Sequence, residues 1–309
     1  MVLGEVGSYI PARRVEIADL QNYLGINRAQ KEIFSRFHNI QRIPMMKEGV
    51  TEDLVRPALE NLFERVNVDR SEIGTFIYCH TIQQVAPFPH SPLRKLQSEF
   101  GLESAETFSL TMQNCASSIT AMDVLRRRFQ SNPKEKYAVV VTGEKAFSPS
   151  VQHIPHTTIM GEASTAVLFK SEGESNQVLA VKQKTLGKFS GGVGLDAATL
   201  KEFEEKYVPT LIEVMSGALS EAGLTWSELD CILPHNINLS SWKRVSKAAN
   251  YPLEKIYLKD LPNQGHCFCS DVFLNYRSAV DEGFLKRGNN FLLASVGLGA
   301  TFAAAVLRH

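Results

Sequence analysis

Cys115 is the residue of this sequence that is best placed to act as a nucleophile. It lies in TMQNCASSITAMDVLRRRF (111–129), where a polar turn of small residues leads into a helical pattern with apolar Ile119, Met122 and Leu125. Unpaired backbone N–H groups and the positive end of the macrodipole at a helix N-terminus favour a thiolate over a thiol. The alternative is a buried structural cysteine, because cysteine is among the residue types that are most often fully buried.

A histidine with possible chemistry follows a short apolar segment in CILPHNINLSSWKRV (231–245). The pattern predicts a buried strand that ends at Pro234 and presents His235 just before a helix. Strand ends are where α/β proteins build their sites. The alternative is an ordinary hydrogen-bonded histidine.

A second histidine lies in LPNQGHCFCSDVFLNY (261–276), where the turn-forming residues before His266 are followed closely by Cys267, Cys269 and Asp271. One interpretation is a metal site, because His and Cys are soft ligands. The usual zinc spacing requires a second ligand pair, and none is found, so we predict no metal. The other interpretation is that His266 acts together with Cys115.

Two glycines lie close together in ASVGLGATFAAAVLR (294–308), between two apolar runs. Gly297 and Gly299 allow the backbone to approach a neighbour closely, which is compatible with a simple tight hairpin. The functional interpretation is that the backbone N–H of Gly299 forms an oxyanion hole with the backbone N–H of Cys115.

These residues must be positioned by an α/β scaffold, because short β-rich runs alternate with longer amphipathic stretches. We expect strands at 73–79, 107–110, 137–143, 164–170, 178–185, 231–234, 291–297 and 301–308. We expect helices near 91–100, after residue 115 and from about 199 to 222. The polar stretch SEGESNQ (171–177) separates two similar series. We therefore divide the chain into halves 1–172 and 173–309 that pack tightly against each other, with the site between them.

The composition excludes several classes of partner. Among 309 residues, 33 Lys and Arg balance 33 Asp and Glu, so there is no global field for nucleic acid or an anionic membrane. No apolar run is long enough to span a membrane and the first residues lack a signal-peptide layout, so we expect a cytoplasmic protein. Five scattered cysteines argue against a secreted disulfide framework.

Taken in order, these segments resemble the ketoacyl synthase III branch of the thiolase superfamily over nearly the whole chain. The opening GSYIPARRVEIADL (7–20), PFPHSPLRKLQSEFGL (87–102) and the strand pair in 135–147 and 160–170 add to the likeness. The resemblance implies a thiolase-like α/β fold in which two pseudo-duplicated halves form a five-layered α-β-α-β-α core. It also implies a dimer, either a homodimer or a heterodimer with a paralogue.

The same resemblance implies a Cys–His–Asn triad, of which Cys115 and His235 match the first two members. His266 stands at the asparagine position, which would make a Cys–His–His set. A neutral imidazole N–H can donate to an enolate oxygen much as an amide does, so we expect Cys115 to accept an acyl group and decarboxylative Claisen condensation with a malonyl-type thioester to follow. Because histidine also accepts protons, acyl transfer to an oxygen or nitrogen nucleophile is the alternative, and an inactive partner subunit is a further one.

The resemblance further implies acyl-coenzyme A or acyl-carrier-protein thioesters as substrates, acyl carrier protein as a possible partner, and no tightly bound cofactor. Two departures bear on recognition: the family's early tryptophan has no counterpart in 28–42, and its longer insertion near the substrate tunnel is reduced to 186–203. The candidates for the substrate pocket are Phe88, Asn114, Asn238 and Phe268.

Overall fold

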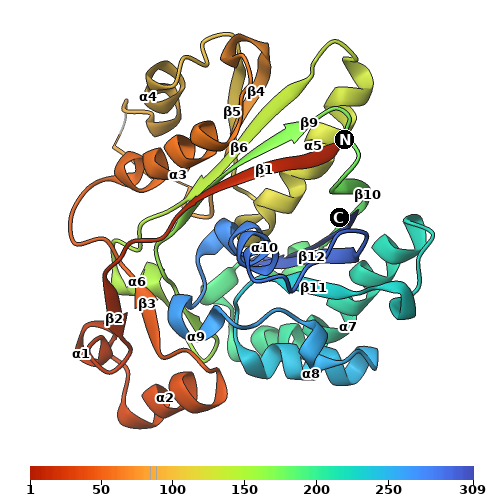
Figure 1. Ribbon diagram of the computed structural model, residues 1–309. Helices are drawn as coiled ribbons and strands as arrows, with labels where there is room; N and C mark the ends of the chain where they lie inside the picture. The colour runs from red at the N-terminus through yellow and green to blue at the C-terminus, as the bar shows by residue number, and fades with distance from the viewer. Residues whose placement is uncertain (84, 88) are drawn as a thin grey trace.

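The computed structural model describes residues 1–83, 85–87 and 89–309. Its centre is a mixed β-sheet with helices on its outer faces and between its two parts (Figure 1). Within the described residues, nine strands follow the order β11-β12-β13-β10-β1-β9-β6-β4-β5. The sheet is continuous only because β1 meets β10 at the pair Val2 and Gln177. It therefore consists of a five-stranded and a four-stranded part.

The five-stranded part belongs to the first half of the chain, whose elements are β1 (Val2–Tyr9), β2 (Arg14–Glu16), α1 (Gln21–Leu24), α2 (Arg28–Glu32), β3 (Arg42–Pro44), α3 (Thr51–Arg65), β4 (Ile73–Cys79), α4 (Pro92–Glu99), β5 (Glu106–Leu110), α5 (Ser117–Ser131), β6 (Tyr137–Gly143), α6 (Pro149–Gln152), β7 (His153–Ile154), β8 (Thr158–Ile159) and β9 (Ser164–Lys170). β4 pairs in parallel with β5 and β6, whereas β9 is antiparallel to β6 and β1. The central strand β6, with sequence YAVVVTG, is buried along almost its entire length, as an apolar β-branched run predicts.

The four-stranded part belongs to the second half, whose elements are β10 (Gln177–Thr185), α7 (Ala197–Glu221), β11 (Cys231–Pro234), α8 (Leu239–Ala249), α9 (Leu261–Gln264), α10 (Asp271–Asp281), β12 (Asn290–Gly297) and β13 (Thr301–Arg308). β11 is parallel to β12, and β13 is antiparallel to β12 and β10, which repeats the pattern of β4, β6, β9 and β1. A single parallel bridge between Ile232 and Ile256 stands where β5 lies in the first half.

The layers follow from which faces the helices cover. α3 packs on β1 and β9 at one outer face, and α7 packs on β10 and β13 at the other. α5 contacts strands of both sheet parts and α10 lies beside it, so these two helices form the middle layer (Figure 1). The five-layered α-β-α-β-α arrangement predicted from the sequence is thereby confirmed.

α5 shows why a central helix has the sequence that it has. Its apolar Ile119, Met122 and Leu125 are buried as the pattern predicts, but Thr120 and Ala121 on the other side are buried too. A helix between two sheets is covered all round, so its small residues matter as much as its apolar ones. The N-terminal ends of α5 and α10 form the place where the two halves meet.

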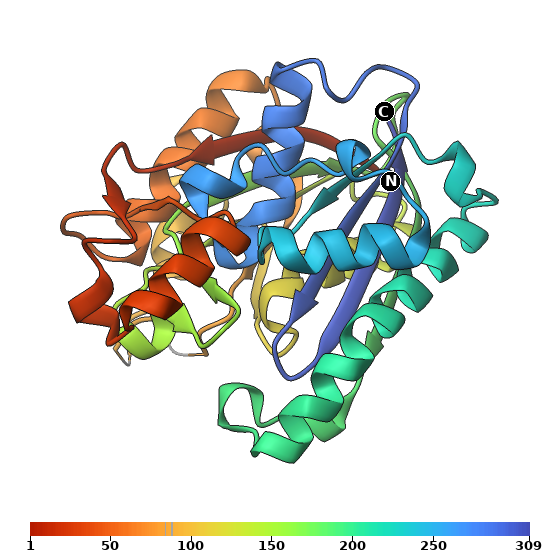
Figure 2. The same cartoon turned by 90° about the horizontal axis from the view of Figure 1, so that it is seen from below.

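The remaining short elements lie outside the layered core. β2 pairs with β3 and β7 with β8, and together with α1, α2, α6 and α9 they form a group at one end of the molecule (Figure 2). The boundary at residue 172 falls in the connection between β9 and β10; the division into 1–172 and 173–309 remains a prediction. Along the described chain, none of the helices combines the length and the apolar character that a membrane crossing requires.

Candidate functional site

Cys115 lies in a turn of 3₁₀ helix, Asn114–Ala116, that connects β5 to the start of α5. The side chain is 4% exposed and its sulfur lies at the N-terminal end of a buried helix, as predicted. Asn114 has a φ of 49°, a left-handed conformation that asparagine tolerates better than most residues. This bend lets a strand turn directly into a helix with the cysteine at the corner.

The end of β12 holds this turn in place. A Cβ atom built on Gly297 would lie 1.8 Å from the carbonyl oxygen of Gln113, so only glycine allows the approach. Ser295 Oγ donates a 2.9 Å hydrogen bond to the carbonyl of Cys115. The side-chain amide of Asn114 donates to the carbonyl of Leu298. The second half of the chain thus fixes the turn that carries Cys115 in the first half.

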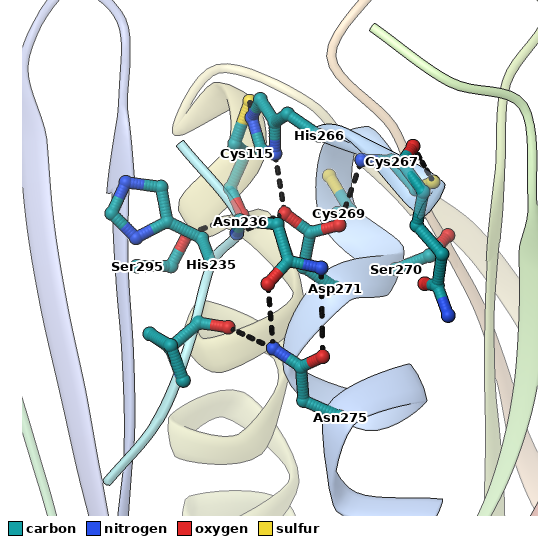
Figure 3. A network of polar contacts seen from close by, with 12 residues as sticks. Cys115, His235, Asn236, His266, Cys267, Cys269, Ser270, Asp271, Asn275 and Ser295 are labelled. Carbon is teal, nitrogen blue, oxygen red and sulfur yellow. Dashed lines mark hydrogen bonds and ion pairs between the residues drawn. The ribbon is translucent and has the colours of Figure 1, made fainter. Parts of the chain in front are cut away.

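His266 makes the most direct contact with the cysteine. Its Nε2 lies 3.1 Å from the Cys115 sulfur, and its Nδ1 is hydrogen-bonded to the carboxylate of Asp271, the first residue of α10 (Figure 3). The imidazole is 1% exposed and the carboxylate is fully buried. Cysteine, histidine and aspartate therefore form a hydrogen-bonded line of the kind that activates a nucleophile.

The backbone orients Asp271 for this contact. Its two carboxylate oxygens accept hydrogen bonds from the N–H of Asn236, at 2.5 Å, and from the N–H of Cys267, at 2.7 Å. Burial alone would lower the pKa of His266, but the Asp271 carboxylate and the Cys115 sulfur outweigh it and raise the pKa to about 10. At neutral pH the imidazole that faces the Cys115 sulfur is therefore protonated.

His235 follows β11, as predicted, and is 1% exposed. The centroid of its ring lies 5.8 Å from that of His266. Its Nδ1 lies 3.3 Å from the carbonyl of Ala294 and its Nε2 lies 3.3 Å from the hydroxyl of Tyr207 on α7. Burial, with a smaller effect of His266, lowers the pKa of His235 to about 3, so this histidine is neutral.

Asn275 on α10 supports the segment that carries His235. Its side-chain amide donates 2.7 Å to the carbonyl of Pro234 and 2.9 Å to the side-chain oxygen of Asn236 (Figure 3). Asn236 in turn donates its backbone N–H to Asp271. One buried network consequently ties both histidine segments to α10.

Two further residues of the site escaped the sequence reasoning. The hydroxyl of Thr81, in the loop after β4, lies 3.6 Å from the Cys115 sulfur. The buried carboxylate of Glu144 accepts the backbone N–H groups of Thr81 and Ile82 at 2.6 and 2.7 Å, and burial raises the pKa of Glu144 to about 7. The glutamate that directly follows the YAVVVTG strand was the available signal, because an acidic residue at a strand end is costly to bury without such partners.

The other four cysteines differ from Cys115 in their surroundings. They are all buried and reduced, and burial raises the pKa of each thiol; these are Cys79, Cys231, Cys267 and Cys269. Within residues 1–83, 85–87 and 89–309, no group of three or more His, Cys, Asp or Glu side chains is arranged to hold a metal ion. Near His266, the thiol of Cys267 lies 3.6 Å from the carbonyl oxygen of Gln264, and the thiol of Cys269 lies 3.2 Å from that of Asn114.

The remaining predicted residues are distributed around this centre. Gly299 has a φ of 118° and lies beside Asn114. The ring of Phe268 lies 6.5 Å from that of His266, packed with Ala146 and Met160. Their roles in the oxyanion hole and the pocket stay predictions.

The two asparagines predicted for the pocket have structural partners instead of a free amide. Asn238 caps α8 by accepting from the N–H of Ser241 at 2.7 Å and donates to the carbonyl of Thr157 at 2.9 Å. The side-chain amide of Asn114 donates its hydrogen bond to the carbonyl oxygen of Leu298. Phe88, the fourth candidate, lies outside the described residues.

Comparisons with known proteins agree with this architecture. The model of the 3-oxoacyl-[acyl-carrier-protein] synthase III C-terminal family matches residues 219–309. A β-ketoacyl-[acyl-carrier-protein] synthase III of Listeria welshimeri is 26% identical, with 99% of this chain and 98% of the relative covered. Among solved structures, the 3-oxoacyl-[acyl-carrier-protein] synthase III of Aquifex aeolicus is 20% identical with a TM-score of 0.83 and covers 100% and 99% of the two chains. The structure named ChlB3 and described as an acyltransferase is 18% identical with a TM-score of 0.87 and covers 99% and 97%.

Proposed function

We propose that this chain, which is similar to ketoacyl synthase III enzymes over nearly its whole length, takes an acyl group from a thioester onto Cys115 and passes it to an oxygen or nitrogen nucleophile. The contact of His266 with both Cys115 and Asp271 carries this proposal. It reverses the order of the two reactions expected from the sequence, in which condensation came first.

The position of the proton on the His266 ring is the reason for preferring acyl transfer to condensation. A carboxylate only accepts hydrogen bonds, so Asp271 keeps a proton on Nδ1 of His266. When the imidazole is neutral, its Nε2 is then a lone pair directed at the Cys115 sulfur. Such a nitrogen cannot replace the amide N–H of an asparagine, but it can accept a proton from an attacking nucleophile.

Acyl loading uses the charged pair. The Cys115 thiolate attacks the carbonyl carbon of the thioester, and the tetrahedral oxyanion is stabilised by backbone N–H groups, for which Cys115 and Gly299 are the candidates. As the carbon–sulfur bond to the donor breaks, the His266 imidazolium gives its Nε2 proton to the departing thiolate. The result is an acyl-Cys115 thioester, a free donor thiol and a neutral His266.

Transfer reverses these roles. An alcohol or amine approaches the acyl carbon, and Nε2 of His266 accepts its proton while the new carbon–oxygen or carbon–nitrogen bond forms. The intermediate collapses by expelling the Cys115 thiolate. The imidazolium and the thiolate are regenerated beside Asp271, ready for the next acyl group.

Decarboxylative Claisen condensation is the second candidate. It is supported by the proximity of two imidazoles, with ring centroids 5.8 Å apart, and by the names of the curated relatives. Condensation would require the histidines to donate hydrogen bonds to an enolate oxygen. It shares the acyl-Cys115 step with the first candidate and differs from it by releasing carbon dioxide from a malonyl donor.

We propose acyl-coenzyme A or acyl-carrier-protein thioesters as donors and a homodimer as the assembly. An inactive partner subunit is disfavoured, because such a subunit has no need for an aligned cysteine, histidine and aspartate.

Intact-protein mass spectrometry tests the proposal. The wild type and Cys115→Ala are incubated with a panel of acyl thioesters, some on coenzyme A and some on acyl carrier protein. We expect an acyl mass increment on the wild type alone, and its removal by hydroxylamine added as a nitrogen nucleophile, with release of a hydroxamate. An equal increment on Cys115→Ala, or none on either protein, would contradict the acyl-cysteine chemistry.

A further inference from the structure

Tyr207 brings a hydroxyl to the site from a helix outside the catalytic segments. It lies on α7, and its ring is held at right angles to Phe203 and at 61° to Phe302, with centroid distances of 5.9 Å in both contacts. This packing directs the hydroxyl to within 3.3 Å of Nε2 of His235. Burial raises the pKa of the phenol, which is therefore protonated at neutral pH.

The two contacts of His235 determine its tautomer. The ring is neutral and carries one proton, and a carbonyl oxygen can only accept. The contact of Nδ1 with the carbonyl of Ala294 therefore puts the proton on Nδ1, and Nε2 accepts from the hydroxyl of Tyr207. Both ring nitrogens are then occupied by protein groups.

This arrangement bears on the choice between the two reactions. In condensation, cleavage of the malonyl carbon–carbon bond releases carbon dioxide and leaves its electron pair on an enolate, whose oxygen needs N–H donors. Neutral His266 offers a lone pair because of Asp271, and His235 offers none of its protons because of Ala294 and Tyr207. A site with one free acceptor, Nε2 of His266, and no free imidazole donor suits proton removal from an alcohol or amine.

We propose that Tyr207 is a specificity-determining residue: by donating to Nε2 of His235 it withholds that nitrogen from a second thioester carbonyl and directs acyl-Cys115 toward heteroatom transfer. The inference rests on the proposed function. Tyr207 acts through His235, so it is a positioning residue.

Tyr207→Phe is the decisive variant, because it keeps the ring between Phe203 and Phe302 and removes only the hydroxyl. Tyr251→Phe is the matched control, since its hydroxyl donates to the carbonyl of Leu229, in contacts unrelated to His235. Each protein is first loaded with the best donor of the thioester panel, and the acyl-enzyme is quantified by mass spectrometry. It is then divided between hydroxylamine and malonyl-coenzyme A.

We expect the ratio of carbon dioxide released to hydroxamate formed to rise about tenfold in Tyr207→Phe, the upper range for one neutral hydrogen bond. It should be unchanged in Tyr251→Phe. A ratio equal to that of the wild type, with normal acyl loading, would overturn the inference and leave the proposed function intact. A wild type that forms no acyl-Cys115 would overturn both.

The tautomer supplies a readout that a loss of packing would not change. ¹⁵N spectra of the imidazoles should show His235 protonated on Nδ1 in the wild type. In Tyr207→Phe, a proton shared between Nδ1 and Nε2 is expected. Protonation on Nε2 alone in the wild type would rule the proposal out.

Discussion

The two central helices of the molecule begin in the same way but with different chemistry. Cys115 lies two residues before α5, and Cys269 lies two residues before α10. Each cysteine is preceded by a residue of positive φ, Asn114 at 49° and Phe268 at 52°. The repeated order of strands and helices thus produces two equivalent turns, Asn114–Ala116 before α5 and Phe268–Ser270 before α10, each with a cysteine in the middle. We call these two turns the cysteine corners.

What separates the corners is the side chain that each sulfur meets. Cys115 contacts an imidazole backed by a carboxylate. Cys269 donates to the carbonyl of Asn114 at 3.2 Å, and burial, together with the charges of Glu144 and Cys115, raises the pKa of its thiol. A position just before a helix is therefore not sufficient to lower the pKa of a buried thiol. The equivalent turn of the second half carries His266 and Asp271 close to the Cys115 sulfur instead.

Removing the carboxylate behind His266 should have the largest effect. Asp271→Asn keeps the side-chain volume and one acceptor oxygen but removes the negative charge that raises the pKa of His266, so the imidazolium that acts in acyl loading is no longer stabilised. We expect the rate of acyl loading to fall by on the order of a hundredfold or more, in line with the loss seen when the aspartate of a serine-protease triad is replaced.

Stopped-flow measurement of donor thiol release, with circular dichroism as the folding control, checks this expectation. Asp260→Asn is a comparison variant for an acidic residue of the same half outside the triad. A rate of loading in Asp271→Asn within threefold of the wild type would remove Asp271 from the mechanism.

Gly297→Ala tests the contact through which the second half fixes the Cys115 corner. The new methyl group would overlap the carbonyl of Gln113, so the turn must move. We expect a destabilisation of about 1–3 kcal/mol, typical of overpacking, and a loss of acyl loading of roughly tenfold or more. Gly187→Ala, where nothing lies within 4 Å of the added atom, should leave both quantities unchanged. Equal behaviour of the two variants would show that the corner does not depend on β12.

The elements that place these corners were predictable because their patterns are local. The buried runs 137–143, 231–234 and 301–308 are strands with the predicted limits, since short apolar runs bounded by turn-forming residues are typical of buried strands. The convergence of Cys115, His235 and His266 was expected because the order of the motifs resembles that of the ketoacyl synthase III family. The distances between these side chains could not be predicted from their positions in the sequence.

The residues that the sequence did not reveal act across long separations. Tyr207 sits on an ordinary helical face and reaches His235 only because α7 packs on β13. Asp271 was visible next to His266, but its contact with Nδ1 depends on how the turn before α10 folds. Sequence patterns report which face is buried, and they do not report which buried polar groups meet.

The His266 pair should also make stability depend on pH. Because the folded-state pKa of His266 is raised to about 10, its contribution is complete below the unfolded value near 6.5 and is lost as the pH rises through 10. We expect the difference in unfolding free energy between the wild type and His266→Asn to shrink by up to about 1.4 kcal/mol for each pH unit over that window. Urea unfolding of both proteins at several pH values measures it, and a constant difference would contradict the charged pair.

The smallest effect is expected at the second corner. Cys269→Ala removes a buried thiol that has backbone and hydroxyl contacts but no imidazole, so acyl loading should stay within about threefold of the wild type, while stability falls by about 1 kcal/mol for the lost packing. Iodoacetamide should label the native wild type once, at Cys115, and should label native Cys115→Ala at none of its cysteines within the same time. Labelling of Cys269 as fast as that of Cys115 would mean that the helix N-terminus alone activates a thiol. The two corners would then differ in how accessible each sulfur is to substrate, and not in whether an imidazole contacts the sulfur.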